Sequence, residues 1–179
     1  MFLSEHRFAD AITSSAKAIA EDHSKTKHAA TEATYLMGLA RSLSGHAKEG
    51  LQTCDEALWM ANQTGNPRLK AEARLALAEA RLEIEDPQGA DSVAAEAQQL
   101  FARLERPEGE WRAWLMTARA NLHIGDRSAA STSAARADSL RSSLRQLWGD
   151  NPFEQYMKRQ DVETYQQQLI KTSATANPR

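Results

Sequence analysis

The chain has 179 residues, of which 41% are apolar and only 6% aromatic. Lysine and arginine (22) nearly balance aspartate and glutamate (24), so a net charge of −2 gives no electrostatic basis for binding nucleic acid or an anionic membrane. A single cysteine excludes an internal disulfide, and the sequence shows neither a signal peptide nor an apolar run long enough to span a bilayer, so we expect a cytoplasmic protein.

Apolar residues recur at helical spacing, and no stretch alternates as a strand does. Four segments carry the signals that end and begin helices: Gly65-Asn66-Pro67, Asp86-Pro87, Gly125-Asp126 and Asn151-Pro152. The sequence therefore predicts helices over residues 6–22, 27–44, 47–64, 67–85, 88–105, 108–124, 127–147 and 152–170. In the last of these the apolar phase changes at residues 159–161, which predicts two short helices or one kinked helix.

Small residues and turn residues recur along these helices at intervals of 40 residues. The sets are Gly38, Ala78 and Ala118; Gly45, Glu85 and Gly125; Gly50, Ala90 and Ala130; and Ala57, Ala97 and Ala137. A period in this range is typical of stacked helical hairpins, in which no unit buries its apolar face alone. The period predicts one all-α domain over residues 1–171, with a half repeat (4–24), three repeats (27–65, 66–105 and 107–147) and a cap (151–171), followed by a polar tail (172–179).

The half repeat aligns with the second helix of a repeat, because residues 8–12 resemble residues 47–51. Either the chain is a fragment of a longer array, which we favour, or another subunit supplies the missing helix. Phe2, Leu3 and Phe8 would then be exposed core residues, and they could pair two copies of the chain as a homodimer.

The repeat pattern resembles that of the tetratricopeptide family. The matching residues are Met37, Gly38, Gly45, Gly50 and Ala57 in the first unit, Leu77, Ala78, Ala90 and Ala97 in the second, and Trp114, Ala118, Gly125, Asp126, Ala130 and Ala137 in the third. The resemblance implies a right-handed solenoid of antiparallel hairpins with a C-terminal capping helix. A period of 40 residues exceeds the usual period of about 34. It is more similar to the longer repeats of large bacterial regulatory proteins.

The resemblance also implies that the first helix of each hairpin lines a concave groove. The groove residues would be Glu32, Tyr35, Leu39, Glu72, Leu75, Glu79, Arg112, Leu115 and Arg119. An apolar strip flanked by charges suits a bound peptide or partner domain. The charges also allow another interpretation, which we favour: Glu72 and Glu79 precede Arg112 and Arg119 by one period, so they can pair between adjacent repeats.

Other chemically distinctive residues have structural interpretations. We expect Cys54 in the core, and Trp111, Trp114, Trp59 and Met60 to pack between helices rather than anchor a ligand. The five histidines lack metal-ligand spacing, and no nucleophile or phosphate-loop motif occurs, so we expect no metal, no cofactor and no enzymatic activity. The sequence favours a non-catalytic scaffold that binds a protein or peptide, with oligomerisation through the half repeat as the alternative.

Overall fold

The computed structural model describes residues 7–23 and 27–177. These residues form helices and no strands, which confirms the all-α prediction. The nine helices of the described residues are α1 (Phe8–Glu21), α2 (His28–Leu43), α3 (Ala47–Thr64), α4 (Pro67–Glu83), α5 (Pro87–Arg103), α6 (Pro107–Ile124), α7 (Arg127–Trp148), α8 (Asp150–Met157) and α9 (Gln160–Ala176).

Three of the four predicted helix starts are capped as expected. The Asn66 side chain accepts hydrogen bonds from two backbone amides in the first turn of α4, and Asp86 and Asp126 each accept one at the starts of α5 and α7. The fourth prediction is wrong. Helix α8 begins at Asp150, directly after Gly149, whose φ of 82° breaks the chain direction, so Asn151 lies inside the helix.

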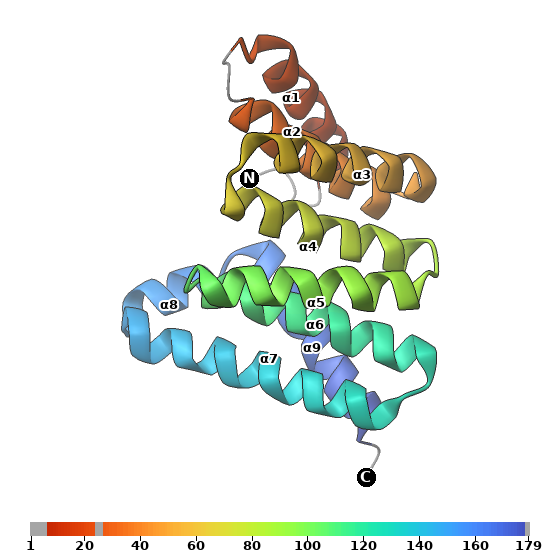
Figure 1. Cartoon of the computed structure of the whole chain (residues 1–179). Coiled ribbons are helices and arrows are strands. Elements are labelled where there is room, and N and C mark those ends of the chain that lie inside the picture. The colour runs from red at the N-terminus through yellow and green to blue at the C-terminus, as the bar shows by residue number, and fades with distance from the viewer. Residues whose placement is uncertain (1–6, 24–26, 178–179) are drawn as a thin grey trace.

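Helices that follow one another in the chain pack against one another down the molecule (Figure 1). Helix α4 also contacts both α2 and α6, whereas α3, α5 and α7 do not contact one another. The array therefore has two layers, one made by the first helix of each hairpin and the other by the second. The terminal helix α1 contacts only α2 among the described elements.

The core consists largely of the small residues that recur in the sequence. Gly38, Ala78 and Ala118 are buried, and so are Ala57, Ala97 and Ala137. Cys54 is fully buried, as expected. Larger side chains fill the C-terminal half of the core: Phe101, Trp111, Leu115, Met116 and Leu144. Alanine and glycine on facing helices allow the backbones to approach closely, which suits a long and thin stack.

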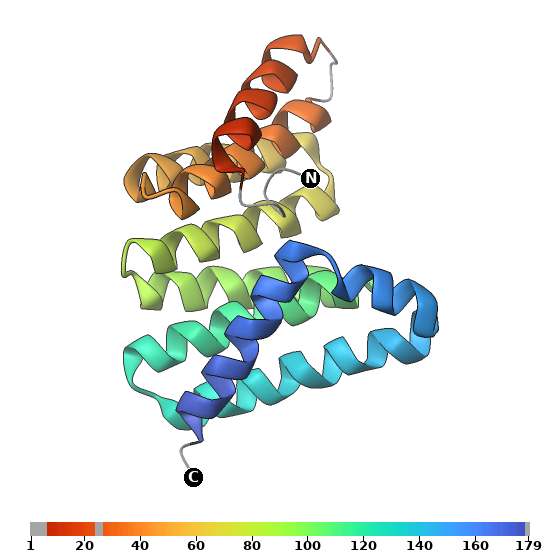
Figure 2. The ribbon, with the colours of Figure 1, turned by 180° about the vertical axis from the view of Figure 1, so that it is seen from behind.

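The last segment forms two helices, as one of the two alternatives predicted. Helix α9 crosses α6 and α7 on the side of the first helices (Figure 2). The prediction that a polar tail begins at residue 172 is wrong, because α9 continues to Ala176. Thr172 and Ala176 extend the buried face of Val162 and Leu169 by further helical turns, so packing rather than residue polarity sets the end of the helix.

One predicted packing residue, Trp59, is on the surface instead. Trp59 is 64% exposed on α3, whereas Ala57 and Ala61 of the same helix are fully buried, so Trp59 lies on the face of α3 that points away from the core. Leu147, at the end of α7, is also exposed (70%). Part of the predicted half repeat, residues 4–6 and 24, lies outside the described residues. So do Phe2 and Leu3, two of the three residues that we expected to be exposed core residues.

Candidate functional site

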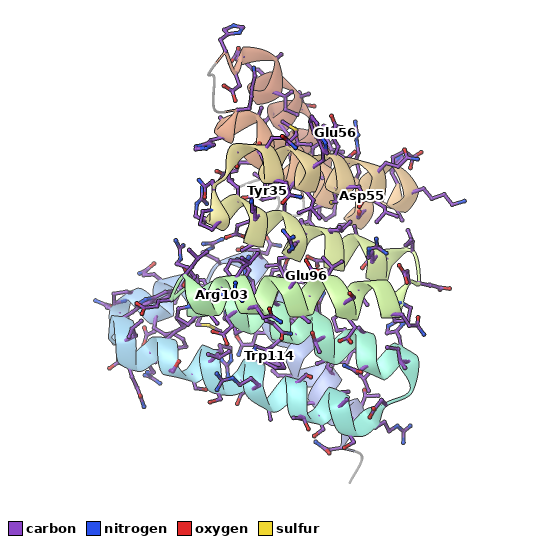
Figure 3. The ribbon with its side chains drawn as sticks, in the orientation of Figure 1. Tyr35, Asp55, Glu56, Glu96, Arg103 and Trp114 are labelled. Carbon is purple, nitrogen blue, oxygen red and sulfur yellow. The ribbon has the colours of Figure 1, made fainter. Side chains whose placement is uncertain are left out.

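The described residues form a cleft of about 880 Å³ between the first helices of the array and the C-terminal helices. Helices α1, α2 and α4 make one side, and α8, α9 and the start of α6 make the other. Apolar residues of the first side include Leu36, Leu39, Leu43, Leu75 and Ala76. Asp55 and Glu56 are exposed on α3, and Glu96 and Arg103 are exposed on α5; none of these four residues lines the cleft (Figure 3).

Most of the residues predicted to line a groove do line this cleft. They are Glu32, Tyr35, Leu39, Glu72, Leu75, Glu79 and Arg112. The prediction that Leu115 lines the groove is wrong, because Leu115 is fully buried in the core and reaches neither the cleft nor the surface. Arg119 lines a separate shallow hollow with Gln168 and Lys171. Both exceptions have one cause: α9 covers α6 at this level and closes the third repeat.

Residues of α9 that the sequence did not assign to the site form its far wall. Asp161, Val162, Thr164, Tyr165 and Gln168 all line the cleft. The side-chain oxygen of Gln168 also accepts a hydrogen bond of 3.2 Å from Arg119. The helical spacing of Val162, Tyr165 and Leu169 was the only signal in the sequence that pointed to this wall. It indicated which face of α9 is apolar, but it did not indicate which helices that face contacts.

Ion pairs connect the first helices of successive repeats. Arg68 lies 3.2 Å from Glu32, Arg112 lies 3.7 Å from Glu72, and Arg119 lies 3.9 Å from Glu79. The hypothesis that Glu72 and Glu79 pair with the arginines of the next repeat is therefore confirmed. All of these side chains except Arg119 line the cleft, and the three ion pairs also connect α2 to α4 and α4 to α6.

Glu79 is the most deeply buried charge of the site, with 2% of the residue exposed. The hydroxyl of Tyr165 donates a 2.8 Å hydrogen bond to its Oε2. Burial raises the pKa of the Glu79 carboxyl, an effect that Arg119 opposes. Burial also raises the pKa of the Tyr165 hydroxyl, and the charge of Glu79 adds to that increase. At neutral pH Tyr165 therefore remains protonated and acts as the donor.

Arg112 occupies the junction of the two sides of the cleft. Its guanidinium lies 5.9 Å from the centre of the Tyr165 ring, within the range of a cation–π contact. Its Nε donates a 3.1 Å hydrogen bond to the backbone oxygen of Glu108. With Glu72 on α4 and Tyr165 on α9, Arg112 connects three helices, so it positions α9 relative to the array.

Tyr35 lies at the centre of the first side of the cleft, with 7% of the residue exposed. Its hydroxyl has no hydrogen-bond partner among the described residues, and its oxygen is not one of their buried polar atoms that lack a partner, so solvent reaches it. Burial raises the pKa of this hydroxyl, and the carboxylates of Glu72 and Glu32 raise it further. The Tyr35 hydroxyl is therefore a neutral group at the surface of the cleft.

The tryptophans are divided between core and surface. Trp111 is fully buried, as expected, and its indole N–H donates a 2.9 Å hydrogen bond to the Tyr156 hydroxyl on α8. Trp114 is half-buried against the same core cluster. Trp111 also meets the Tyr165 ring edge-on, with 6.3 Å between the ring centres. It therefore helps to seat both C-terminal helices rather than anchor a ligand.

Comparison with known proteins adds no assignment, because neither a protein-family model nor a curated protein sequence matches this chain. In residues 7–23 and 27–177, no helix combines the length and apolar character needed to cross a bilayer. The same residues contain no group of three or more His, Cys, Asp or Glu side chains placed to hold a metal ion. The candidate site therefore rests on the cleft and its geometry.

Proposed function

We propose that this chain is a non-catalytic interaction module that holds a peptide or a segment of a partner protein in the cleft. The observation that carries the proposal is the composition of the cleft: an apolar strip of Leu36, Leu39 and Leu75 on successive first helices, framed by paired charges. Apolar contact supplies binding free energy, and polar groups at the margin select orientation.

The arrangement of helices is consistent with a right-handed, tetratricopeptide-like solenoid whose period is about 40 residues. In such an array the first helices form the concave side, where peptides bind. The long repeat supports an origin as the C-terminal repeat region of a larger bacterial regulatory protein in the cytoplasm. Such a region would act as a scaffold that holds a partner protein.

Selection of short random peptides displayed on phage would test the proposal. We expect selected peptides to bind the parent chain and a Leu147→Glu variant, whose substitution lies on the exposed end of α7. A Leu39→Glu variant places a charge on the apolar strip and should lose binding by at least tenfold. Equal binding by the two variants, with both folded by circular dichroism, would locate the peptide outside the cleft and reject the proposal.

A specific observation also supports the alternative, oligomerisation through the half repeat. Helix α1 contacts α2 alone among the described elements, and Ile12 and Ile19 remain partly exposed on it. A second copy that packs on α1 would cover them. Sedimentation of the parent chain and an Ile19→Glu variant tests this: a dimer that becomes a monomer supports the alternative, and a parent that is a monomer at all concentrations rejects it.

A further inference from the structure

The concave side of the array repeats the same positions along the first helices, and α9 covers the third set of them. Positions one period apart line the cleft in the first two repeats: Tyr35 and Leu36, and then Leu75 and Ala76. The period of 40 residues gives Leu115 and Met116 as their equivalents in the third repeat. Both are fully buried, and α9 lies across α6 and α7 on this side (Figure 2). Helix α9 therefore occupies the surface of the third repeat that corresponds to the open cleft of the first two.

Helix α9 has few buried side chains for its length. Ten of the 17 residues of α4 are buried, but only four of the 17 residues of α9 are: Val162, Leu169, Thr172 and Ala176. Helix α8 has no buried residue. Regions with few buried apolar contacts open at a lower free energy than the core of a protein. Helices α8 and α9 should therefore open before the rest of the array unfolds.

Gly149 connects these two helices to the array. Its φ of 82° and ψ of 168° end α7, and glycine adopts a positive φ without steric cost. No described helix follows α9, so a rotation at Gly149 breaks only the contacts that α8 and α9 make with the earlier helices. The contacts among α1 to α7 are kept.

Two hydrogen bonds fix the position of α9 on the concave side. The Tyr165 hydroxyl donates to Glu79 at 2.8 Å, and the Gln168 side chain accepts from Arg119 at 3.2 Å. Glu79 belongs to α4 and Arg119 to α6, so α9 is held to two successive first helices. Removal of the Tyr165 hydroxyl should favour opening, because only the closed position loses a hydrogen bond.

We propose that α8 and α9 form a strap that closes over the concave face of the third repeat and opens while the array remains folded. Opening removes the wall that α9 gives to the cleft and uncovers Leu115 and Met116, which extends the apolar strip of Leu36 and Leu75 by one repeat. This inference rests on the proposed function and deepens it, because the strap sets how much of the concave face a partner can reach.

Thiol labelling of the full chain tests the strap. Leu115→Cys places a thiol under α9, and the native Cys54, fully buried in α3, reports opening of the array in the same molecule. We expect the thiol at residue 115 to react with iodoacetamide about tenfold or more faster than Cys54, since labelling follows the population of the open form. Its rate should also depend less on added urea, because opening of the strap exposes less surface than unfolding of the array. Mass spectrometry of the digested protein measures both rates.

Tyr165→Phe, added to Leu115→Cys, should raise the labelling rate at residue 115 by about tenfold, the factor that corresponds to a hydrogen bond to a carboxylate. Gln167→Ala, at an exposed position of the same helix, is the matched control and should leave the rate unchanged. Hydrogen exchange of the parent chain, which needs no substitution, should show the amides of α9 exchanging faster than those of α4.

Equal rates and equal urea dependence at the two thiols would overturn the inference, and so would amides of α9 that exchange only together with those of α4. An unchanged rate in the Tyr165→Phe variant would overturn it as well. None of these measurements uses a partner, so a strap that never opens leaves the proposed function standing. Equal peptide binding by the Leu39→Glu and Leu147→Glu variants rejects the proposed function whatever the labelling shows.

Discussion

The hydroxyl of Tyr165 on α9 donates a 2.8 Å hydrogen bond to the buried carboxylate of Glu79 on α4, across 86 positions of sequence. No other hydrogen bond between described residues joins these two helices. Tyr165 also contacts Trp111 and Arg112 on α6, so a single side chain connects the C-terminal helix to two successive first helices. This contact fixes the wall of the cleft that α9 provides.

Tyr165→Phe keeps the ring in place and removes the donor to Glu79. We expect the free energy of unfolding to fall by about 1 to 3 kcal/mol, because a buried carboxylate loses a hydrogen bond. Urea denaturation followed by circular dichroism measures the change. Tyr35→Phe is the matched control, since its hydroxyl has no partner among the described residues, and it should cost nothing. Equal losses in the two variants would contradict the role assigned to the Tyr165 hydroxyl.

The buried Glu79 carboxyl also predicts a dependence of stability on pH. Because burial raises its pKa in the folded chain above the ordinary value of 4.5, the folded state holds more protons than the unfolded state in the interval between the two values. The contribution of Glu79 to stability is therefore complete below pH 4.5 and is lost as the pH rises through the higher folded-state pKa.

Glu79→Gln removes this titration and keeps an oxygen that can accept from Tyr165. We expect the parent chain to lose stability relative to Glu79→Gln as the pH rises from 4.5. Urea titrations of both proteins at a series of pH values measure the difference. A parent chain that gains stability relative to the variant over this interval would show that the ion pair with Arg119 outweighs burial.

The period of 40 residues made the ion pairs between neighbouring repeats predictable. Because equivalent residues of neighbouring first helices lie side by side, the spacing of Glu72 from Arg112 and of Glu79 from Arg119 was enough to pair them. The helix ends were predictable for a similar reason. A cap such as Asn66 acts on backbone amides two and three residues away, so the signal and its effect lie in the same short segment.

The position of α9 was not predictable from the same pattern. Its docking depends on Tyr165, Gln168 and Leu169, which meet α4, α6 and α7 through contacts that no repeat relates to one another. The burial of Leu115 follows from that docking, and so does the separation of Arg119 from the cleft. A periodic sequence therefore predicts the stack but leaves its irregular end, which completes the candidate site, to long-range packing.

At Gly50 the helices α2 and α3 approach each other closely. A Cβ atom at this position would clash with the Ser42 side chain and would lie 2.5 Å from the Ser42 backbone nitrogen and 2.8 Å from the Gly38 oxygen. We expect Gly50→Ala to lower the free energy of unfolding by about 1 to 3 kcal/mol, because the backbone of α2 must move. Thermal and urea denaturation measure the effect.

The sign of this change is informative, because alanine is favoured over glycine in a helix by about 1 kcal/mol when nothing else intervenes. Asn62→Ala, at an exposed position of the same helix, is the control and should be neutral or slightly stabilising. A stabilising Gly50→Ala would mean that α2 and α3 separate at little cost. Alanine occupies the equivalent positions, residues 90 and 130, so only the first hairpin should require glycine.

Glu85 occupies a left-handed backbone conformation with a φ of 60°, at the turn where the other two repeats have Gly45 and Gly125. The three turns share one hydrogen-bond pattern: the amide of the following residue bonds the carbonyl oxygen four residues before the turn residue, as Asp86 does with Arg81 at 2.9 Å. The left-handed conformation costs a residue with a Cβ roughly 1 to 2 kcal/mol, whereas glycine adopts it freely.

Glu85→Gly should therefore raise the free energy of unfolding by about 0.5 to 1 kcal/mol, once the greater flexibility that glycine gives the unfolded chain is subtracted. Urea denaturation at neutral pH measures the change. Gly125→Ala imposes the same conformation on a residue with a Cβ and should lower stability by a similar amount. If Glu85→Gly destabilised the chain, the Glu85 side chain would have to make a compensating contact in the folded state, and the strain assigned to this turn would be rejected.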